Sequence, residues 1–186
     1  MSNKQELSAD ALARAKKIKL VGFDVDGVLT NGGLFFGDDG QEYKAFNSRD
    51  GHGIKMLHNN GIQTAIITGR TSRVVEYRAA NLGIDIIYQG QDDKSAALDE
   101  LLKETGLTAQ ELAYVGDDVV DLPVLGRVGL AIAVNDAHPM VVANCHWQTA
   151  NAGGHGAGRD VCEMLLESQG LLDREWAKYL PASDDS

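Results

Sequence analysis

The sequence predicts a doubly wound α/β fold, with a mostly parallel, Rossmann-like sheet flanked by helices. Short apolar runs alternate with amphipathic stretches of helical period along most of the chain. This alternation is typical of right-handed βαβ units, which build parallel sheets. Polar residues and glycines follow the apolar runs directly. The length of 186 residues suits one domain with a real core, so we expect residues 1–186 to form a single domain.

The first elements are a helix, a strand and a hairpin. We expect a helix over Ser8–Lys16, since Ser8 can cap it and apolar residues follow at helical spacing. The apolar run at residues 18–23, which ends before Asp24, predicts a buried strand. Two aromatic-containing runs around the turn at residues 37–40 predict a β-hairpin inserted after this strand. The aromatic residues of such a hairpin need burial, which association with other subunits would provide.

Helices and strands alternate through the rest of the chain. The glycine-rich residues 153–160 are not expected to form a packed element, and the acidic tail after Pro181 is expected to fray. The further expected strands cover residues 63–67, 85–88, 112–115 and 129–134, and the further expected helices cover residues 53–58, 72–82, 94–104, 121–125 and 161–166.

Composition restricts the possible partners and location. The net charge of −10, from 17 basic and 27 acidic side chains, argues against nucleic acid as a partner. The 2 cysteines, Cys145 and Cys162, show no metal-binding spacing and are expected to be free thiols. Residues 1–17 lack the apolar core of a signal peptide, and no apolar run approaches the ~20 residues of a membrane helix. We therefore expect a cytoplasmic protein with no membrane partner.

Polar residues at the strand ends form the most informative pattern. Asp24 and Asp26 follow the first strand, while Thr68, Gly90 and Asp117 follow three others. Ligands of open α/β sheets bind outside the carboxyl ends of the strands, where these residues should meet. A single aspartate there is often a turn former or a helix cap, but three together are poorly explained in that way. The carboxylate pair favours a hard-cation site, a nucleophile, or both.

These residues suit metal-assisted chemistry on a phosphate. Mg²⁺ usually takes one or two carboxylates, which Asp24 and Asp117 could supply, with the backbone carbonyl of Asp26 as a further ligand. Asp24 could attack phosphorus to form an aspartyl-phosphate. Asp26 could protonate the leaving oxygen and then deprotonate the attacking water. Further hydroxyl, N–H and ammonium donors to the phosphate would come from Thr68, Gly69 and Lys94.

Four motifs in this order resemble those of the haloacid dehalogenase superfamily of phosphotransferases: residues 24–30, residues 68–70, Lys94 and residues 116–118. The resemblance implies Asp24 as the nucleophile, Asp26 as the general acid and base, and Thr68 and Lys94 as catalytic phosphate-binding groups. It implies Mg²⁺ held by Asp24, Asp26 and Asp117, with Asp118 and Asp121 in support. The gaps between the motifs are too short for a cap domain, so the chain resembles the capless class.

Longer segments resemble the family of 3-deoxy-D-manno-octulosonate 8-phosphate phosphatases: residues 44–51, 66–70, 88–90, 113–118 and 136–139. The resemblance implies a phosphorylated eight-carbon sugar acid as substrate, in lipopolysaccharide precursor synthesis. It also implies a homotetramer, in which the oligomerisation hairpin of residues 31–46 joins a central barrel and a neighbouring subunit does the work of a cap. Residues 151–186 resemble a mobile C-terminal segment that reaches a neighbour's site, although His155 stands where the family commonly has an arginine.

The same resemblance implies the substrate contacts. Residues 47–51 resemble the family's substrate loop, and Arg49 offers a planar fork to anionic groups. Arg70 and Arg78 could contact the phosphate and carboxylate ends of the substrate, although Arg78 could equally be a surface arginine of a helix. The expected substrate-binding residues are Asp26, Asn47, Ser48, Arg49, Asp50, Gly51, Thr68, Gly69, Arg70, Arg78 and Lys94.

Two other functions stay open at this point. Similar capless domains act on nine-carbon, sialic-type sugar acid phosphates. Related domains attached to nucleotidyltransferases serve as non-catalytic tetramerisation modules. The intact pair of Asp24 and Asp26 argues against the second alternative, because a scaffold needs neither carboxylate.

Overall fold

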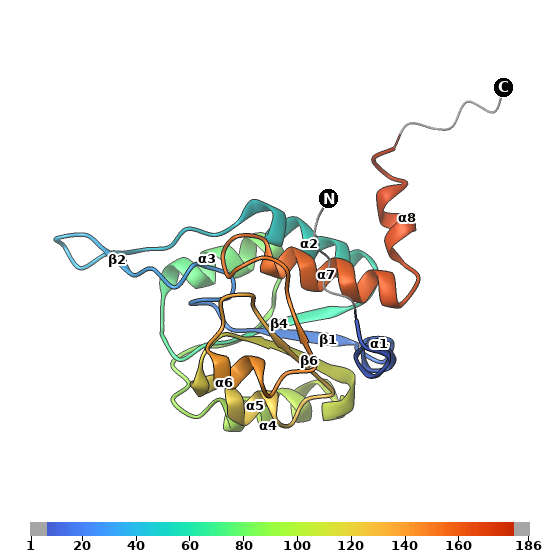
Figure 1. Cartoon of the computed structure of the whole chain (residues 1–186). Helices are drawn as coiled ribbons and strands as arrows, with labels where there is room; N and C mark the ends of the chain where they lie inside the picture. Colours follow the sequence, from blue (N-terminus) through green and yellow to red (C-terminus); the bar gives the residue numbers. More distant parts are fainter. Residues whose placement is uncertain (1–6, 181–186) are drawn as a thin grey trace.

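The computed structural model describes residues 7–180; the tail expected to fray after Pro181 lies outside them. Its centre is an open sheet of six strands in which every neighbouring pair is parallel (Figure 1). The predicted doubly wound α/β class is confirmed. In spatial order the strands are β5 (Ile86–Tyr88), β4 (Gln63–Ile67), β1 (Leu20–Phe23), β6 (Leu112–Gly116), β7 (Leu130–Ala133) and β8 (Trp147–Gln148).

Helices cover both faces of the sheet (Figure 1). Several begin or end at a capping residue. Ser8 accepts a hydrogen bond from the N–H of Ala11, and Gly83 ends its helix in the left-handed conformation that glycine tolerates best. One layer holds α1 (Ala9–Ala15), α2 (Ser48–Asn59), α3 (Arg73–Leu82) and α7 (Ala157–Ser168), and the other holds α4 (Lys94–Thr105), α5 (Leu122–Leu125) and α6 (Pro139–Val142).

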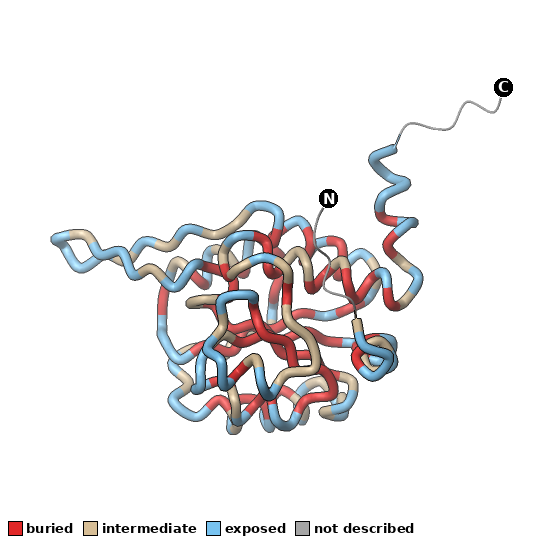
Figure 2. Tube along the Cα trace, viewed as in Figure 1, coloured by how far each residue is buried: buried red, intermediate tan, exposed pale blue. Residues whose placement is uncertain are grey.

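The core consists of two apolar clusters, one on each face of the sheet (Figure 2). Successive strand residues point to opposite faces, so each buried strand contributes to both clusters. On β6, Ala113 and Val115 pack toward α2 and α7, while Leu112 and Tyr114 pack toward α4 and α5. A strand with apolar residues on both faces appears in the sequence as a continuous apolar run. Such runs are the signal from which these strands were predicted.

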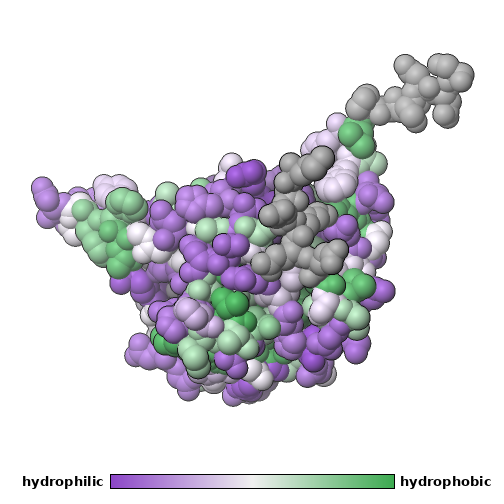
Figure 3. All heavy atoms as spheres, in the orientation of Figure 1, coloured by the Kyte–Doolittle hydropathy of each residue, from purple (hydrophilic) through white to green (hydrophobic). Residues whose placement is uncertain are grey.

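The predicted hairpin is present, with β2 (Phe35–Phe36) paired antiparallel to β3 (Glu42–Tyr43). It projects away from the body of the molecule (Figure 1), and an apolar patch lies on it next to its hydrophilic tip (Figure 3). Phe35 and Phe36 are 56% and 58% exposed. Only this hairpin and α2 separate β1 from β4, so the prediction that no cap domain is present is confirmed.

Two predicted helix starts are wrong. Helix α7 begins at Ala157 rather than at Val161. Helix α2 begins at Ser48 rather than at Gly53, because Asn47 caps it by accepting a hydrogen bond from the N–H of Arg49. Residues 47–51 are therefore a helix start and not an open loop. Short elements went unpredicted because a few residues carry no periodic signal. They are β8, α6, α8 (Leu172–Trp176) and the 3₁₀ helices η1 (Ala109–Glu111) and η2 (Val119–Asp121).

The glycine-rich residues 153–160 are packed, contrary to expectation. Helix α7 begins at Ala157, and Ala157 and Gly158 are buried. The N–H of Gly154 donates to the carbonyl of Val28 at 2.9 Å, so this segment lies beside the loop that follows β1. A Cβ at Gly153 would lie 1.8 Å from the carbonyl oxygen of Gly27, which explains why glycine is needed there. The mobility of residues 151–186 stays a prediction. Among the described residues, every helix is too short or too polar to cross a membrane.

Candidate active site

The site lies where the sheet reverses its direction of winding. From the central strand β1 the chain moves outward to β4 and β5, then returns to add β6, β7 and β8 on the other side. The switch point is thus between β1 and β6, and ligands of doubly wound sheets bind in the crevice at such a point. Asp24 directly follows β1, and Asp117 directly follows β6. The predicted convergence of these two residues is observed.

Gly27 allows the two loops to approach each other. Its φ of +88° lies in the left-handed region, where glycine is strongly favoured. A Cβ at this position would lie 2.1 Å from Oδ2 of Asp117. Any side chain at position 27 would therefore displace the Asp117 carboxylate, so the glycine serves both the turn and the close approach.

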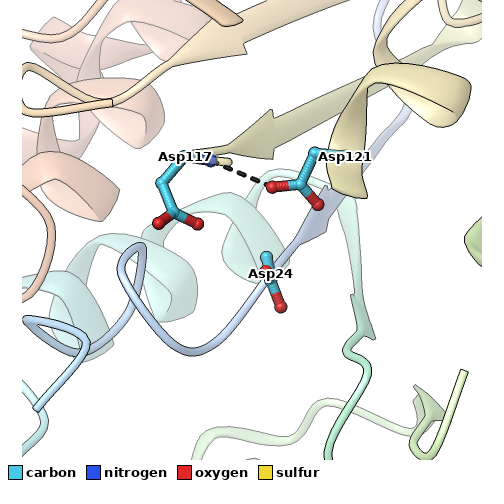
Figure 4. Close-up of side chains that lie close together, drawn as sticks. All are labelled: Asp24, Asp117 and Asp121. Carbon is cyan, nitrogen blue, oxygen red and sulfur yellow. Dashed lines mark hydrogen bonds between the residues drawn. The ribbon is translucent and has the colours of Figure 1, made fainter. Parts of the chain in front are cut away.

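Three carboxylates converge in this crevice (Figure 4). One oxygen from each of Asp24, Asp117 and Asp121 lies within 4.8 Å of the others. Burial, and then the neighbouring Asp121 carboxylate, raise the pKa of Asp117 to about 7. Burial raises the pKa of Asp24 to about 6, although the charge of Lys94 opposes this rise. A divalent cation would favour the ionised forms of these acids, and carboxylate oxygens are the ligands Mg²⁺ prefers. The residues present therefore fit a magnesium ion.

Asp121 differs from the other two because its hydrogen-bonding capacity is already used. The residue is fully buried in η2. Its Oδ2 accepts hydrogen bonds from the N–H groups of Asp117 at 3.0 Å and Asp118 at 3.3 Å. Its Oδ1 accepts from Nζ of Lys94 at 2.7 Å and from the hydroxyl of Tyr114 at 3.0 Å. Since a carboxylate offers about four acceptor sites, Asp24 and Asp117 are better placed as direct metal ligands.

Lys94 places a buried positive charge next to these acids. It begins α4 and is 3% exposed, and its Nζ lies 2.8 Å from Oδ2 of Asp24. Burial acts to lower the pKa of Lys94, but the Asp24 and Asp121 carboxylates outweigh it and raise that pKa. The side chain is thus held as an ammonium at the bottom of the crevice. An anion entering the site would meet this charge.

A pocket of about 280 Å³ opens above the cluster. Thr68 and Gly69, which follow β4, line one side, and their loop is tied to its neighbour by a hydrogen bond from the N–H of Gln91 to the carbonyl of Thr68. The complete lining is Asp24, Asp26, Thr68, Gly69, Arg70, Gln91, Asp92, Lys94, Asp117, Asp118 and Val120. Every residue for which a catalytic or metal-binding role was predicted therefore borders one pocket.

Asp26 lies at the mouth of the pocket in a network of four charges. Lys44, whose side chain is 1% exposed, pairs with Oδ1 of Asp26 and lies 3.2 Å from Glu42 on β3. Arg70 lies 3.2 Å from the same Glu42 oxygen and 3.7 Å from Oδ2 of Asp26. The base of the hairpin is therefore joined electrostatically to the predicted general acid and base.

The other predicted substrate residues lie outside this pocket. Asn47, Asp50, Gly51 and Arg78 border a separate small hollow between α2 and α3. Nη2 of Arg78 donates to the carbonyl of Asn47 at 3.1 Å, and its guanidinium lies over the Phe46 ring. Ser48 and Arg49 are exposed at the start of α2. Within one chain, these residues are not brought together with Asp24.

Some residues of the site were missed by sequence reasoning. Glu42 lies in hairpin strand β3 and Lys44 directly follows it, in a segment where charged residues usually face solvent. Tyr114 lies in an apolar run and reads as a core residue. Asp121, four residues after Asp117, was considered only as an outer support of the metal. For Asp121 the sequence did offer a signal. It lies four residues after Asp117, and side chains at that spacing lie close together when the chain between them forms a helical turn.

Comparison with known proteins agrees with this geometry. A family model described as haloacid dehalogenase-like hydrolase matches residues 84–159. The 3-deoxy-D-manno-octulosonate 8-phosphate phosphatase KdsC of Escherichia coli K12 is 48% identical over 167 residues, which cover 90% of this chain and 89% of that protein.

Solved structures show the same similarity over the whole fold. The crystal structure of 3-deoxy-D-manno-octulosonate 8-phosphate phosphatase from Yersinia pestis is 46% identical, with a TM-score of 0.88 and coverage of 90% of each chain. That of the Moraxella catarrhalis phosphatase, in complex with a magnesium ion, a phosphate ion and a KDO molecule, is 42% identical, with a TM-score of 0.90 over 92% of this chain and 98% of that one. The chain belongs to the haloacid dehalogenase-like hydrolases and, among them, to the 3-deoxy-D-manno-octulosonate 8-phosphate phosphatase family.

Proposed function

We infer that this protein is a Mg²⁺-dependent phosphomonoesterase that releases phosphate from 3-deoxy-D-manno-octulosonate 8-phosphate. The observation that carries this inference is the cluster of Asp24, Asp117 and Lys94 at the sheet's switch point, in a chain of this family. Family membership also supports a place in lipopolysaccharide precursor synthesis and a cytoplasmic location.

The phosphate group would enter a site with a nucleophile at its base. When bound, Mg²⁺ would neutralise charge on the phosphate and on the carboxylates of Asp24 and Asp117. One oxygen of Asp24 attacks phosphorus, the bond from phosphorus to the sugar oxygen breaks, and Asp24 carries the phosphoryl group. The N–H of Val25 and the ammonium of Lys94 hold the Asp24 carboxylate in place, at 2.7 and 2.8 Å.

Asp26 supplies the two proton transfers. It gives its proton to the departing sugar oxygen in the first step, and it takes a proton from the attacking water in the second. Hydrolysis of the aspartyl-phosphate then releases phosphate and restores the Asp24 carboxylate. Lys44 and Arg70 flank the Asp26 carboxylate and fix its position at the pocket mouth.

The phosphate is held by donors from three loops. Thr68 and Gly69 line the pocket after β4, where the Thr68 hydroxyl and the Gly69 N–H would donate to the phosphate, and Lys94 lines it from the start of α4. Such preorganised donors stabilise the charge that spreads over the phosphoryl oxygens in the transition state. Positioning and charge therefore account for most of the catalysis that we propose.

The sugar acid would extend from the pocket mouth toward a second copy of the chain. Arg70 borders the mouth, whereas residues 47–51 and Arg78 lie elsewhere in the same chain. We infer that a neighbouring subunit brings its own residues 47–51 to the substrate in a homotetramer. The exposed aromatic residues of the hairpin support this assembly, because an isolated chain would leave them in water.

Released phosphate would be measured with Mg²⁺ for a panel that includes the eight-carbon substrate, a nine-carbon sialic-type sugar acid phosphate and simple phosphate esters. We expect the eight-carbon substrate to give the highest kcat/KM, and excess chelator to stop turnover. A preference for the nine-carbon compound would establish the alternative phosphatase. Equal rates on all esters would contradict a sugar-acid phosphatase.

Asp24→Asn tests the nucleophile separately. It keeps the shape of the side chain but removes the attacking charge, so we expect turnover to fall at least about a thousandfold. The oligomeric mass and thermal midpoint should stay near those of the wild type. Unchanged turnover would exclude Asp24 as the nucleophile, and an inactive wild type with intact assembly would favour the non-catalytic module.

A further inference from the structure

Tyr114 on β6 carries a polar group into the buried layer between the sheet and α4. Its hydroxyl lies 3.0 Å from the carbonyl oxygen of Ile67 and 3.0 Å from Oδ1 of Asp121. Nζ of Lys94 donates to the same hydroxyl oxygen at 3.4 Å. One hydroxyl group therefore contacts the end of β4 next to Thr68, the start of α4, and η2.

The Tyr114 ring reaches these groups by crossing the central strand. Strand β1 lies between β6 and β4, and its Gly22 is paired with Tyr114 on one side and Ala65 on the other. A Cβ at position 22 would lie 2.9 Å from Cδ2 of the Tyr114 ring, too close for the ring to stay in place. The absence of a side chain at Gly22 thus provides the space through which Tyr114 crosses β1.

Tyr114 is a donor that stays protonated. Burial, together with the Asp121 and Asp24 carboxylates, raises the pKa of the Tyr114 hydroxyl well above its ordinary value. The group has one proton to donate, and a carboxylate is the stronger of its two acceptors. Without it, Oδ1 of Asp121 would keep only the bond from Lys94, although Asp121 is itself 0% exposed. Loss of one hydrogen-bond donor from a buried polar network leaves an acceptor unsatisfied, which is costly in free energy and allows the remaining side chains to shift.

We propose that Tyr114 is a positioning residue of the phosphate site. Its hydroxyl holds the Asp121 carboxylate, and through Asp121 it holds the Lys94 ammonium between Asp24 and the incoming phosphate. The expected effect of Tyr114 on turnover rests on the proposed function. Its expected effect on phosphate binding rests on the geometry alone.

Tyr114→Phe tests this role, since it removes the hydroxyl and keeps the ring. Tyr88→Phe is the matched control, because the Tyr88 hydroxyl also donates to a carboxylate, that of Glu104 at 2.8 Å, but outside the pocket. Binding of orthophosphate in the presence of Mg²⁺ would be measured by calorimetry. We expect about tenfold weaker binding and about tenfold lower kcat/KM for Tyr114→Phe, and values within about twofold of wild type for the control.

Thermal unfolding separates positioning from a general loss of structure. We expect Tyr114→Phe to melt within a few degrees of the wild type, so that the protein is folded at the assay temperature. Gly22→Ala is the second variant, since it keeps the hydroxyl but displaces the ring, and it should also weaken orthophosphate binding.

Orthophosphate affinity of Tyr114→Phe within about twofold of wild type would overturn the proposal. If the proposed function were wrong instead, the wild type would bind orthophosphate but would not hydrolyse the sugar acid phosphate. In that case the loss of affinity in Tyr114→Phe would still support the positioning role.

Discussion

Asp50 is an acid buried between α2 and α7, away from the catalytic pocket. Its Oδ1 accepts a hydrogen bond from the N–H of Arg159 at 2.8 Å, and its Oδ2 has no hydrogen-bond partner among the described residues. Burial raises its pKa from the ordinary 3.8 to about 6. Between pH 3.8 and about 6, the folded protein therefore binds the Asp50 proton more tightly than the unfolded chain does.

The pH dependence of stability follows from this difference. As pH rises from 3.8 to about 6, the unfolded chain ionises first, so Asp50 makes the folded state progressively less stable, and the loss persists at higher pH. Asp50→Asn removes the effect. We therefore expect the stability of Asp50→Asn to improve, relative to that of the wild type, as pH rises from mild acid to neutral. The difference between the two free energies of unfolding should change by on the order of 1–3 kcal/mol over this range.

Urea denaturation across this pH range would measure the difference. Asp173→Asn, at an exposed position on α8, is the matched control and should follow the wild-type profile. Parallel profiles for Asp50→Asn and wild type would show that the Asp50 proton is not linked to folding.

The convergence of the pocket residues could be predicted from the sequence, because Asp24, Thr68 and Asp117 directly follow strands and Lys94 begins the helix after β5, in an order that resembles known motifs. Asp24, Thr68, Lys94 and Asp117 need only the strand ends to come together, and the topology of parallel sheets guarantees this. Lys44 could not be predicted, because its burial depends on a contact between the hairpin base and Asp26. The role of Tyr114 could not be predicted either. It depends on the space left by Gly22, which lies far away in the sequence and becomes a neighbour only when β1 pairs with β6.

Helix α7 shows why elements outside the sheet were harder to predict. Its sequence begins in a glycine-rich stretch, yet the glycines there permit close contact rather than flexibility. A Cβ at Gly53 of α2 would lie 3.0 Å from Cβ of Cys162, and one at Gly158 would lie 3.1 Å from Cβ of Asp50. Close packing of α2 and α7 therefore requires small residues on both helices, whereas the glycine-rich composition predicted no packed element there.

Leu165→Ala measures how much α7 contributes to stability. Leu165 is fully buried in the cluster between the sheet and the α2 layer. We expect a loss of about 2–5 kcal/mol in the free energy of unfolding, from lost burial and from the cavity left behind. Leu180→Ala, at a residue 67% exposed, should change stability by less than about 0.5 kcal/mol. A small effect of Leu165→Ala in urea denaturation would mean that residues 157–168 are only loosely attached, as a mobile segment would be.

The described part of the molecule combines a sheet with an apolar core on each face and a hairpin whose aromatic side chains are exposed. A two-stranded hairpin is marginal in water without further packing. The hairpin nevertheless contributes Lys44 and Glu42 to the network around Asp26. Association of the hairpins would therefore also steady one edge of the catalytic pocket. This connection is not visible in the sequence, because the hairpin signal is local while the ion pairs join residues far apart in the chain.

The proposed tetramer can be dissociated at this hairpin. Leu34→Lys combined with Phe35→Lys replaces two exposed apolar residues with charges that an apolar interface would not accommodate, and it leaves Phe36, whose ring lies under Arg70, unchanged. Because both side chains are largely exposed in the single chain, the rest of the protein should stay folded. We expect light scattering to give the mass of a single chain, and turnover of the sugar acid phosphate to fall because no neighbour completes the substrate site. Met140→Lys, at an apolar residue of similar exposure on α6, should leave the mass unchanged. A hairpin variant that keeps the wild-type mass would show that the subunits associate through another surface.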